Sequence, residues 1–245
     1  MASSRLGSLI AFVRRAVEQE SSYLVPLRLF IGIGWSRAGL EKVLDPRWND
    51  GTALTQFLLK KVDGGDVVFP TYQILIEEVF IPNAALLSVV IILGQLLAGA
   101  AIMLGAFTNL GLMGGLFMNV NFILAGQVNP SAFYVVIESV LFVANVGAVI
   151  GFDEVISRRV RYPWLVAHPH WDQDYVPMEK RSFLVLALLS ALVALVASVH
   201  VRDWGPTSVD DPAMILLVLS TLGGLSTLIV YFRFRERATA ARRPT

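Results

Sequence analysis

The sequence predicts an all-α integral membrane protein with six transmembrane helices and very little soluble structure. Of its 245 residues, 55% are hydrophobic and 16% are charged, whereas soluble domains carry about 25% charged residues. The mean hydropathy is +0.63, and six stretches reach the roughly 20 apolar residues that a helix needs to cross a bilayer. A soluble core of this size cannot hide so much apolar surface, so we expect the lipid bilayer to cover it.

The composition excludes several kinds of chemistry. The net charge is +1 and cysteine is absent, so there is no basic excess for nucleic acid and no thiolate for a disulfide, a nucleophile or an iron–sulfur cluster. The histidines lie in a predicted loop (His168, His170) and at the end of a predicted span (His200). We expect no haem, iron–sulfur cluster or metal on this chain. Any redox role would use an organic cofactor such as a quinone, or a partner chain.

Residues 1–20 precede the first span and form a unit of their own. Arg14 and Arg15 interrupt the apolar core that a cleavable signal peptide needs. Leucine, isoleucine and valine recur at helical spacing between residues 5 and 18. We therefore predict a cytoplasmic amphipathic helix that lies on the membrane surface.

Six apolar stretches follow and are predicted to span the membrane. They cover residues 23–44, 82–104, 110–126, 130–151, 182–201 and 213–232. The turns between the second and third spans and between the third and fourth are short, which makes these helices antiparallel neighbours. The sequence therefore predicts a four-helix transmembrane core over residues 21–153. A two-helix hairpin with a basic cytoplasmic tail follows over residues 182–245.

Two long loops connect the spans. The outer loop, 45–81, should contain a short helix at 52–62, a turn at 63–66 and an amphipathic stretch at 70–80. It either caps the outer mouth of the bundle or is an ordinary surface loop. The cytoplasmic loop, 154–181, is aromatic, and its aromatic residues form either an interfacial belt or a surface for a partner. These residues are Tyr162, Trp164, His168, His170, Trp171 and Tyr175.

Basic residues predict the orientation of the chain. Cytoplasmic loops of membrane proteins carry an excess of lysine and arginine. With the N-terminus inside, the outer segments carry only Arg47, Lys60, Lys61 and Arg202, whereas the tail alone carries Arg233, Arg235, Arg237, Arg242 and Arg243. Both termini are therefore predicted to be cytoplasmic.

The first span holds most of the charge predicted to lie inside the membrane. Arg28, Gly32, Trp35, Gly39 and Lys42 form one stripe at helical spacing. Small residues let a neighbouring helix approach closely, so we expect this stripe to face the bundle. The alternative for the basic residues at its two ends is that they reach out to the membrane interfaces.

Ionisable residues inside a membrane are costly and are therefore functional candidates. In the first span Arg37 and Glu41 are four residues apart and can pair with each other. The other spans add Glu138 and the amides Gln95, Asn119, Asn121 and Asn145, mostly between the midplane and the outer leaflet. Glu138 would need Arg37, an amide or a proton as its partner there. An Arg–Glu pair with amides around it predicts a pocket for a polar headgroup or an anion. The alternative is hydrogen bonding between packed helices.

Four short motifs resemble the DoxX/DoxD family of membrane proteins. The first span reads LRLFIGIGWSRAGLEK over residues 27–42, which is similar to the R…G…aromatic…G..K pattern of that family. GQLLAG at 94–99, LGAFT at 104–108 and NVNFILAG at 119–126 are similar as well. The likeness covers about residues 20–153. The family often has glutamate where this chain has Gln95, so an acid–base role there is not implied.

The resemblance implies a multi-pass protein of the prokaryotic plasma membrane in a respiratory or redox setting. We predict a membrane subunit of a quinone-linked system, of the thiosulfate:quinone oxidoreductase type. Its partners would be the lipid bilayer and other membrane or redox subunits, and not nucleic acid. Arg37, Glu41 and Glu138 are the predicted catalytic residues. The predicted cofactor-binding residues are Arg28, Trp35, Lys42, Gln95, Asn119 and Asn121.

Two other functions remain open from the sequence. The chain is alternatively a non-catalytic accessory subunit of a larger respiratory complex. In that case the charged stripe serves helix packing, and the aromatic loop and the added hairpin contact partner chains. A carrier for a small solute or ion is the third interpretation, although no inverted repeat is visible.

Overall fold

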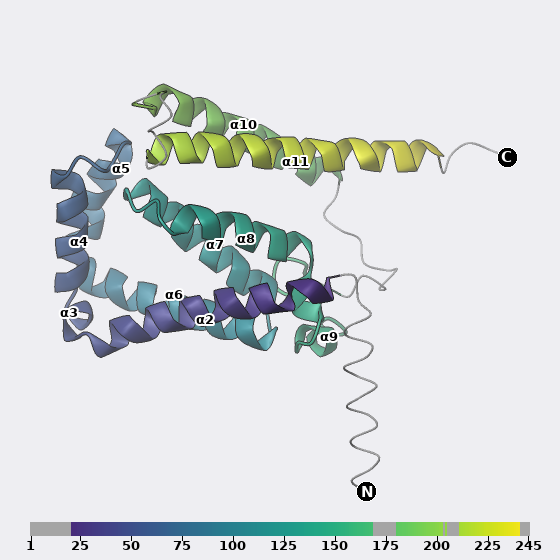
Figure 1. The fold of residues 1–245 in the computed structure, drawn as a ribbon, viewed down its shortest axis with the longest axis horizontal. Helices are drawn as coiled ribbons and strands as arrows, with labels where there is room; N and C mark the ends of the chain where they lie inside the picture. The colour runs from purple at the N-terminus through teal and green to yellow at the C-terminus, as the bar shows by residue number, and fades with distance from the viewer. Residues whose placement is uncertain (1–20, 169–179, 203, 205–210, 241–245) are drawn as a thin grey trace, which may run out of the picture.

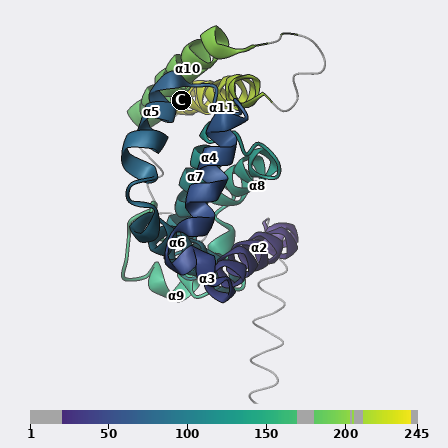
Figure 2. The same ribbon diagram turned by 90° about the vertical axis from the view of Figure 1, so that its left-hand side faces the viewer.

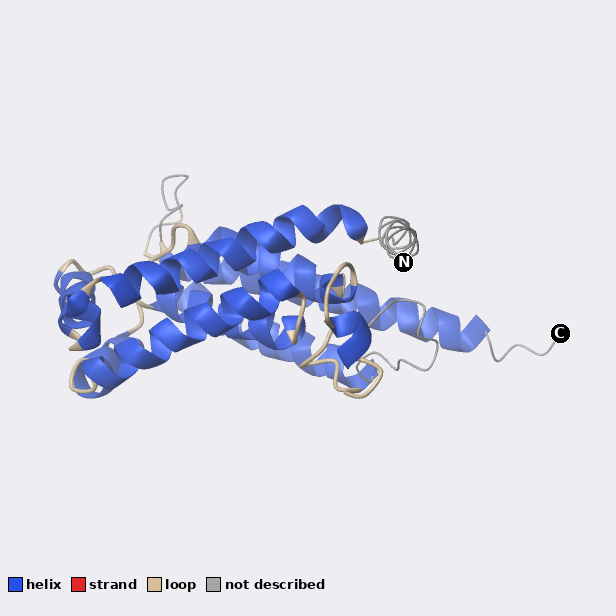
Figure 3. Ribbon diagram, turned by 90° about the horizontal axis from the view of Figure 1, so that it is seen from below, coloured by secondary structure: helices blue, strands red, loops and turns tan. Residues whose placement is uncertain are grey.

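The computed structural model describes residues 21–168, 180–202, 204 and 211–240. Their regular structure is entirely helical, as predicted (Figure 3). Six longer helices lie in three stacked pairs (Figure 1). The pairs are α2 (Val25–Leu44) with α6 (Ala84–Leu104), α7 (Thr108–Leu124) with α8 (Ser131–Val143), and α10 (Lys180–His200) with α11 (Pro212–Ala240). The amphipathic helix predicted at 5–18 lies outside the described residues.

Among the described residues, two helices are both long enough and apolar enough to cross a membrane. They are Ala84–Leu104 and, within α10, Phe183–His200. Three further apolar helices are shorter, namely Thr108–Leu124, Ser131–Val143 and Pro212–Leu228. Each of the predicted spans thus corresponds to a helix, but length and composition alone support a membrane crossing for only two of them.

The fourth predicted span is shorter than expected, because α8 ends at Val143. Asn145 and Ile150 both adopt a left-handed backbone with φ of 49°, so the chain turns instead of continuing as a helix to residue 151. Arg28 stabilises the turned segment from α2. Its guanidinium donates hydrogen bonds to the carbonyl oxygens of Val146, Val149 and Ile150 at 2.8–2.9 Å.

Small residues bring α2 and α6 into close contact. A Cβ atom on Gly99 would lie 2.6 Å from the backbone nitrogen of Ser36, and one on Gly39 would lie 2.8 Å from the side chain of Leu96. Gly32 lies equally close to α6. The prediction that this side of the first span faces the bundle is confirmed, because its buried residues are Arg28, Ile31, Gly32, Trp35 and Gly39.

The loop between α2 and α6 closes one end of the bundle. It forms α3 (Pro46–Asn49), α4 (Thr52–Asp63), α5 (Pro70–Leu75) and a single π-helical turn η2 (Ile76–Phe80). Figure 2 shows α4 lying across this end of the helices. The helix predicted at 52–62 and the turn after it are confirmed. We call this end of the molecule the α4 end.

A glycine lets α4 begin against α6. Gly51 has φ of +80°, and a Cβ atom there would lie within 2.6 Å of the Ala84 backbone. Any other residue would be strained at this φ and would collide with the start of α6. Leu54 and Leu58 of α4 are buried in a cluster with Ala84 and Ala125.

The hairpin of α10 and α11 rests on the four-helix core near the α4 end. Arg202 donates hydrogen bonds to the carbonyl oxygens of Gly65 at 2.6 Å and Val67 at 3.3 Å. Asp211 accepts from the backbone nitrogen of Ala213 at 2.9 Å and so caps the start of α11. The apolar contact consists of Val68, Phe69, Ile123, Ala197, Ala213 and Leu216.

Asp153, in the short helix α9 (Asp153–Ile156), organises the opposite end. Its carboxylate accepts hydrogen bonds from the backbone nitrogens of Phe107 (2.7 Å), Thr108 (3.0 Å) and Ala167 (3.2 Å). Burial raises the pKa of the Asp153 carboxyl group, and the hydrogen bonds that this group accepts lower it. The start of α7 and the described part of the loop over residues 154–181 are therefore held by one carboxyl group. We call this the α9 end.

Candidate functional site

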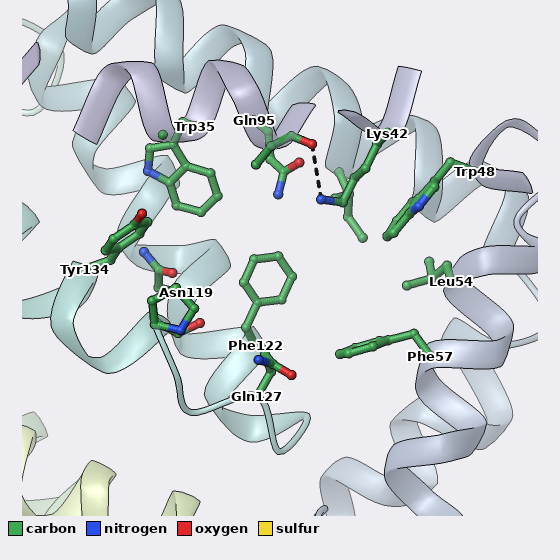
Figure 4. Close-up of a pocket in the computed structure, with 15 residues that line it drawn as sticks. Trp35, Lys42, Trp48, Leu54, Phe57, Gln95, Asn119, Phe122, Gln127 and Tyr134 are labelled. Atoms are coloured by element: carbon green, nitrogen blue, oxygen red, sulfur yellow. Dashed lines mark hydrogen bonds between the residues drawn. The ribbon is translucent and has the colours of Figure 1, made fainter. Parts of the chain in front are cut away.

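A cavity of about 300 Å³ lies between the first four long helices near the α4 end (Figure 4). Side chains of α2, α4, α6, α7 and α8 meet around it. The residues that line it are Gly34, Trp35, Ala38, Lys42, Trp48, Leu54, Phe57, Ile91, Gln95, Asn119, Phe122, Gln127, Pro130, Ser131 and Tyr134.

Five aromatic side chains contribute to the wall. Trp35 and Tyr134 pack edge to face, with ring centroids 6.4 Å apart. Phe122 lies between them and the α4 end, where Trp48 and Phe57 complete the wall (Figure 4). Because the loop over residues 45–81 supplies two of these rings, it covers this end of the helix bundle.

Lys42 carries the positive charge of the cavity. Its ammonium group lies 4.8 Å from the centroid of the Trp48 ring, within the range of a cation–π interaction. It also donates a hydrogen bond of 3.3 Å to the carbonyl oxygen of Ala38 in its own helix. An ammonium has three donors, so Lys42 can also contact an acceptor placed in the cavity.

Three amides, Gln95, Asn119 and Gln127, line the cavity among the aromatic rings (Figure 4). Gln95 is 2% exposed, and among the described residues nothing donates to its buried Oε1. A buried acceptor without a partner is costly, and a ligand with a hydrogen-bond donor would remove that cost. Asn119 is also 2% exposed. Figure 4 shows its amide oxygen turned toward the cavity and its nitrogen turned away.

Glu138 lies directly behind this wall and is fully buried. Its Oε1 accepts a hydrogen bond of 2.6 Å from Trp35 Nε1, and its Oε2 accepts one of 3.0 Å from Asn119 Nδ2. None of the ion pairs found in the described part of the chain involves Glu138. An indole and an amide, rather than Arg37, are thus the partners of this carboxyl group.

Gly115 leaves the room that these hydrogen bonds need. A Cβ atom at this position would overlap Glu138 Oε1 and would lie 2.9 Å from Trp35 Nε1. The neighbouring Gly114 has open space around it. Gly111, one turn before Gly115, lies close to α6, since a Cβ atom there would be 3.0 Å from Ala101 Cβ. Both glycines thus allow close packing of α7, and at Gly115 the close neighbours are the polar atoms behind the cavity.

The structure brings some of the predicted site residues together and separates others. Trp35, Lys42, Gln95 and Asn119 line the cavity, and Glu138 supports its wall. Arg28 instead binds backbone carbonyls at the α9 end.

The other predicted site residues point away from the cavity. Arg37 and Glu41 pair with each other at 2.7 Å on an exposed face, with 79% and 61% of their side chains accessible. Asn121 accepts a hydrogen bond of 2.9 Å from the Tyr72 hydroxyl. Asn145 belongs to the turned segment after α8.

Several cavity residues were not predicted. Tyr134 lies one helical turn before Glu138, and Phe122 lies three residues after Asn119, so helical spacing from the polar residues would have found both. Trp48 and Phe57 carry no such signal. They reach the cavity only because the outer loop folds back over the bundle.

Comparisons of this chain with protein families, with curated proteins and with solved structures give no match. The arrangement itself indicates what the site can bind. A flat ring fits between aromatic side chains, the amides offer hydrogen bonds, and Lys42 offers a positive charge at the α4 end. These groups together suit contact with a small ring that carries polar substituents.

Proposed function

We propose that this chain is a six-span membrane subunit of a quinone-linked redox system and that the cavity holds the ring of the quinone. The observation that carries the proposal is the combination of five aromatic side chains with the Lys42 ammonium group and buried amides in a single cavity. The resemblance of residues 20–153 to the DoxX/DoxD family supports the same setting.

The size and chemistry of the cavity fit such a ring. A protein cavity of roughly 150 Å³ lined by apolar side chains holds benzene, and this one measures about 300 Å³. Trp35, Phe122 and Tyr134 would contact the ring faces and edges, while Lys42 and the amides of the wall would lie beside its two oxygen substituents. When bound, a quinone supplies the two-electron chemistry that the side chains of this chain do not supply.

The surface of the molecule supports the membrane setting. Helices α6 and α10 expose many large apolar side chains, including Leu86, Leu93 and Leu97 of α6 and Leu188 and Leu195 of α10. A soluble protein rarely exposes so large an apolar surface. In the proposed arrangement α2, α6, α7, α8, α10 and α11 cross the bilayer, and the α4 end faces outward.

The proposal is tested by filling the cavity. Ala38 lines it, whereas Leu40 on the same helix is 53% exposed. In detergent, the wild-type chain should bind duroquinone, a water-soluble benzoquinone. Ala38→Phe should weaken binding at least tenfold because the new ring occupies the same space.

The matched variant Leu40→Phe adds a similar ring outside the cavity and should bind as the wild type does. Titration calorimetry measures both affinities, and circular dichroism checks that both variants fold. Equal binding by the two variants, or no binding by the wild type, would contradict the proposal.

A further inference from the structure

Of the three amides that line the cavity, Asn119 and Gln127 have a fixed direction, since the Gln127 nitrogen donates to the carbonyl oxygen of Asn129 at 2.6 Å. Gln95 makes no hydrogen bond through Oε1 among the described residues, so its amide can turn over and offer either its oxygen or its nitrogen. The hydroxyl groups of Ser131 and Tyr134 donate or accept according to their rotation. Asn119 is different, because its nitrogen already donates to Glu138.

A chain of two hydrogen bonds sets the direction of the Asn119 amide. The indole nitrogen of Trp35 can only donate, and it donates to Glu138 Oε1. As a carboxylate, Glu138 has only acceptors, and its second oxygen accepts from Asn119 Nδ2. With its nitrogen held in this way, Asn119 presents only its oxygen to the cavity (Figure 4).

The two ends of the cavity therefore favour opposite groups. Asn119 and Lys42 lie on opposite sides of it (Figure 4). At one side the Asn119 oxygen requires a donor from the ligand. At the other side the Lys42 ammonium, which has only donors, requires an acceptor.

A hydroquinone meets both requirements and a quinone meets only one. Each hydroxyl of a hydroquinone can donate or accept, so one hydroxyl can donate to Asn119 while the other accepts from Lys42. A quinone has two carbonyl oxygens, which only accept, and it would place one of them against the Asn119 oxygen.

We infer that Glu138 makes the cavity selective for the reduced, hydroxyl-bearing form of its ring ligand by fixing the direction of the Asn119 amide. This inference rests on the proposed function. Glu138 is a positioning residue in it, because its carboxyl group acts through Asn119 and lies behind the cavity wall.

Replacing Glu138 by glutamine should reverse the preference. Trp35 can only donate, so the glutamine oxygen must face it, and the glutamine nitrogen must face Asn119. Asn119 then has to turn its oxygen toward that nitrogen and its own nitrogen toward the cavity. Both sides of the cavity would then offer donors, which suits the two carbonyl oxygens of a quinone.

The test compares the affinities for duroquinone and durohydroquinone, measured without oxygen by titration calorimetry in detergent. The wild-type chain should bind durohydroquinone at least tenfold more tightly than duroquinone, and Glu138→Gln should bind duroquinone more tightly. Glu78→Gln is the matched control, because Glu78 is exposed in η2, and it should keep the wild-type preference.

The outcomes separate the inference from the proposed function. Equal binding of the two forms by the wild type, or an unchanged preference in Glu138→Gln, overturns the inference while binding itself still supports the proposed function. If neither form binds the wild type, the proposed function fails and the inference fails with it. If Glu138→Gln does not fold, the two affinities of the wild-type chain test the inference, and equal affinities overturn it.

Discussion

At the scale of single residues, the cavity wall depends on how Trp35, Asn119 and Glu138 are packed. The sequence could predict that a glutamate in an apolar stretch would be important, because such a group needs a partner or a proton. It could not predict which partner. Arg37 was the expected cation, but it lies on an exposed face with Glu41, while Glu138 receives an indole and an amide from two other helices.

Two neighbouring glycines test this packing. Gly115→Ala should lower the free energy of unfolding by about 2 kcal/mol, because the added methyl group overlaps Glu138 and overpacking of a core typically costs 1–3 kcal/mol. Gly114→Ala should change it by less than about 0.5 kcal/mol, since its Cβ atom meets nothing within 4 Å. Thermal unfolding in detergent compares the two, and equal effects would show that the polar atoms behind the cavity tolerate displacement.

At the scale of elements, apolar runs predict where helices lie but not where each one ends. The fourth predicted span contains a helix, as expected, but α8 stops at Val143. The cause lies in Arg28, more than a hundred residues earlier in the chain, which binds the carbonyl oxygens of the turned segment. The apolar pattern of the fourth span cannot reveal a contact with a residue so far away in the sequence.

The junction at the α9 end should depend on Asp153. Asp153→Ala leaves three backbone N–H groups without their acceptor, and an unsatisfied buried donor costs roughly 1–3 kcal/mol. We expect a loss of about 3 kcal/mol or more in the free energy of unfolding. Glu154→Ala, which removes only a 3.8 Å pair with exposed Arg158, should cost less than about 1 kcal/mol. Comparable losses in both variants would contradict the role given to Asp153.

The contact between α2 and α6 should depend on Gly99. Gly99→Ala places a methyl group against the backbone of Ser36 and Gly32, so the helices must separate. Gly94→Ala meets only the flexible Met118 side chain at 3.3 Å. The first variant should lower the midpoint of thermal unfolding by several degrees more than the second. A smaller or equal shift in Gly99→Ala would show that the helix pair can adjust.

At the scale of the whole molecule, the sequence predicted the four-helix core and the hairpin, because each apolar run must be buried in lipid or in protein. The cavity could be predicted only in part. Gln95 and Asn119 stand out as amides in apolar helices, whereas Trp48 and Phe57 enter the wall through the fold of a loop. That fold depends on contacts such as those of Leu54 with α6, which join distant parts of the chain.

The proposed orientation can be tested because the chain has no cysteine. A single cysteine placed at Asp63, at the α4 end, should react with a membrane-impermeant maleimide in intact cells. One placed at Arg158, at the α9 end, should react only after the membrane is opened. The reverse pattern would show that the chain is inserted the other way, and labelling of both sites in intact cells would contradict a membrane between them.

Photolabelling with an azido-benzoquinone tests most directly whether the cavity holds a quinone ring. In membranes that contain the wild-type chain, we expect labels on residues 34–48 and 119–134, which form most of the cavity wall, and we expect excess duroquinone to suppress them. Peptide mapping by mass spectrometry locates the labels. Labels confined to α10 and α11, or labels that duroquinone does not suppress, would contradict a quinone site in this cavity.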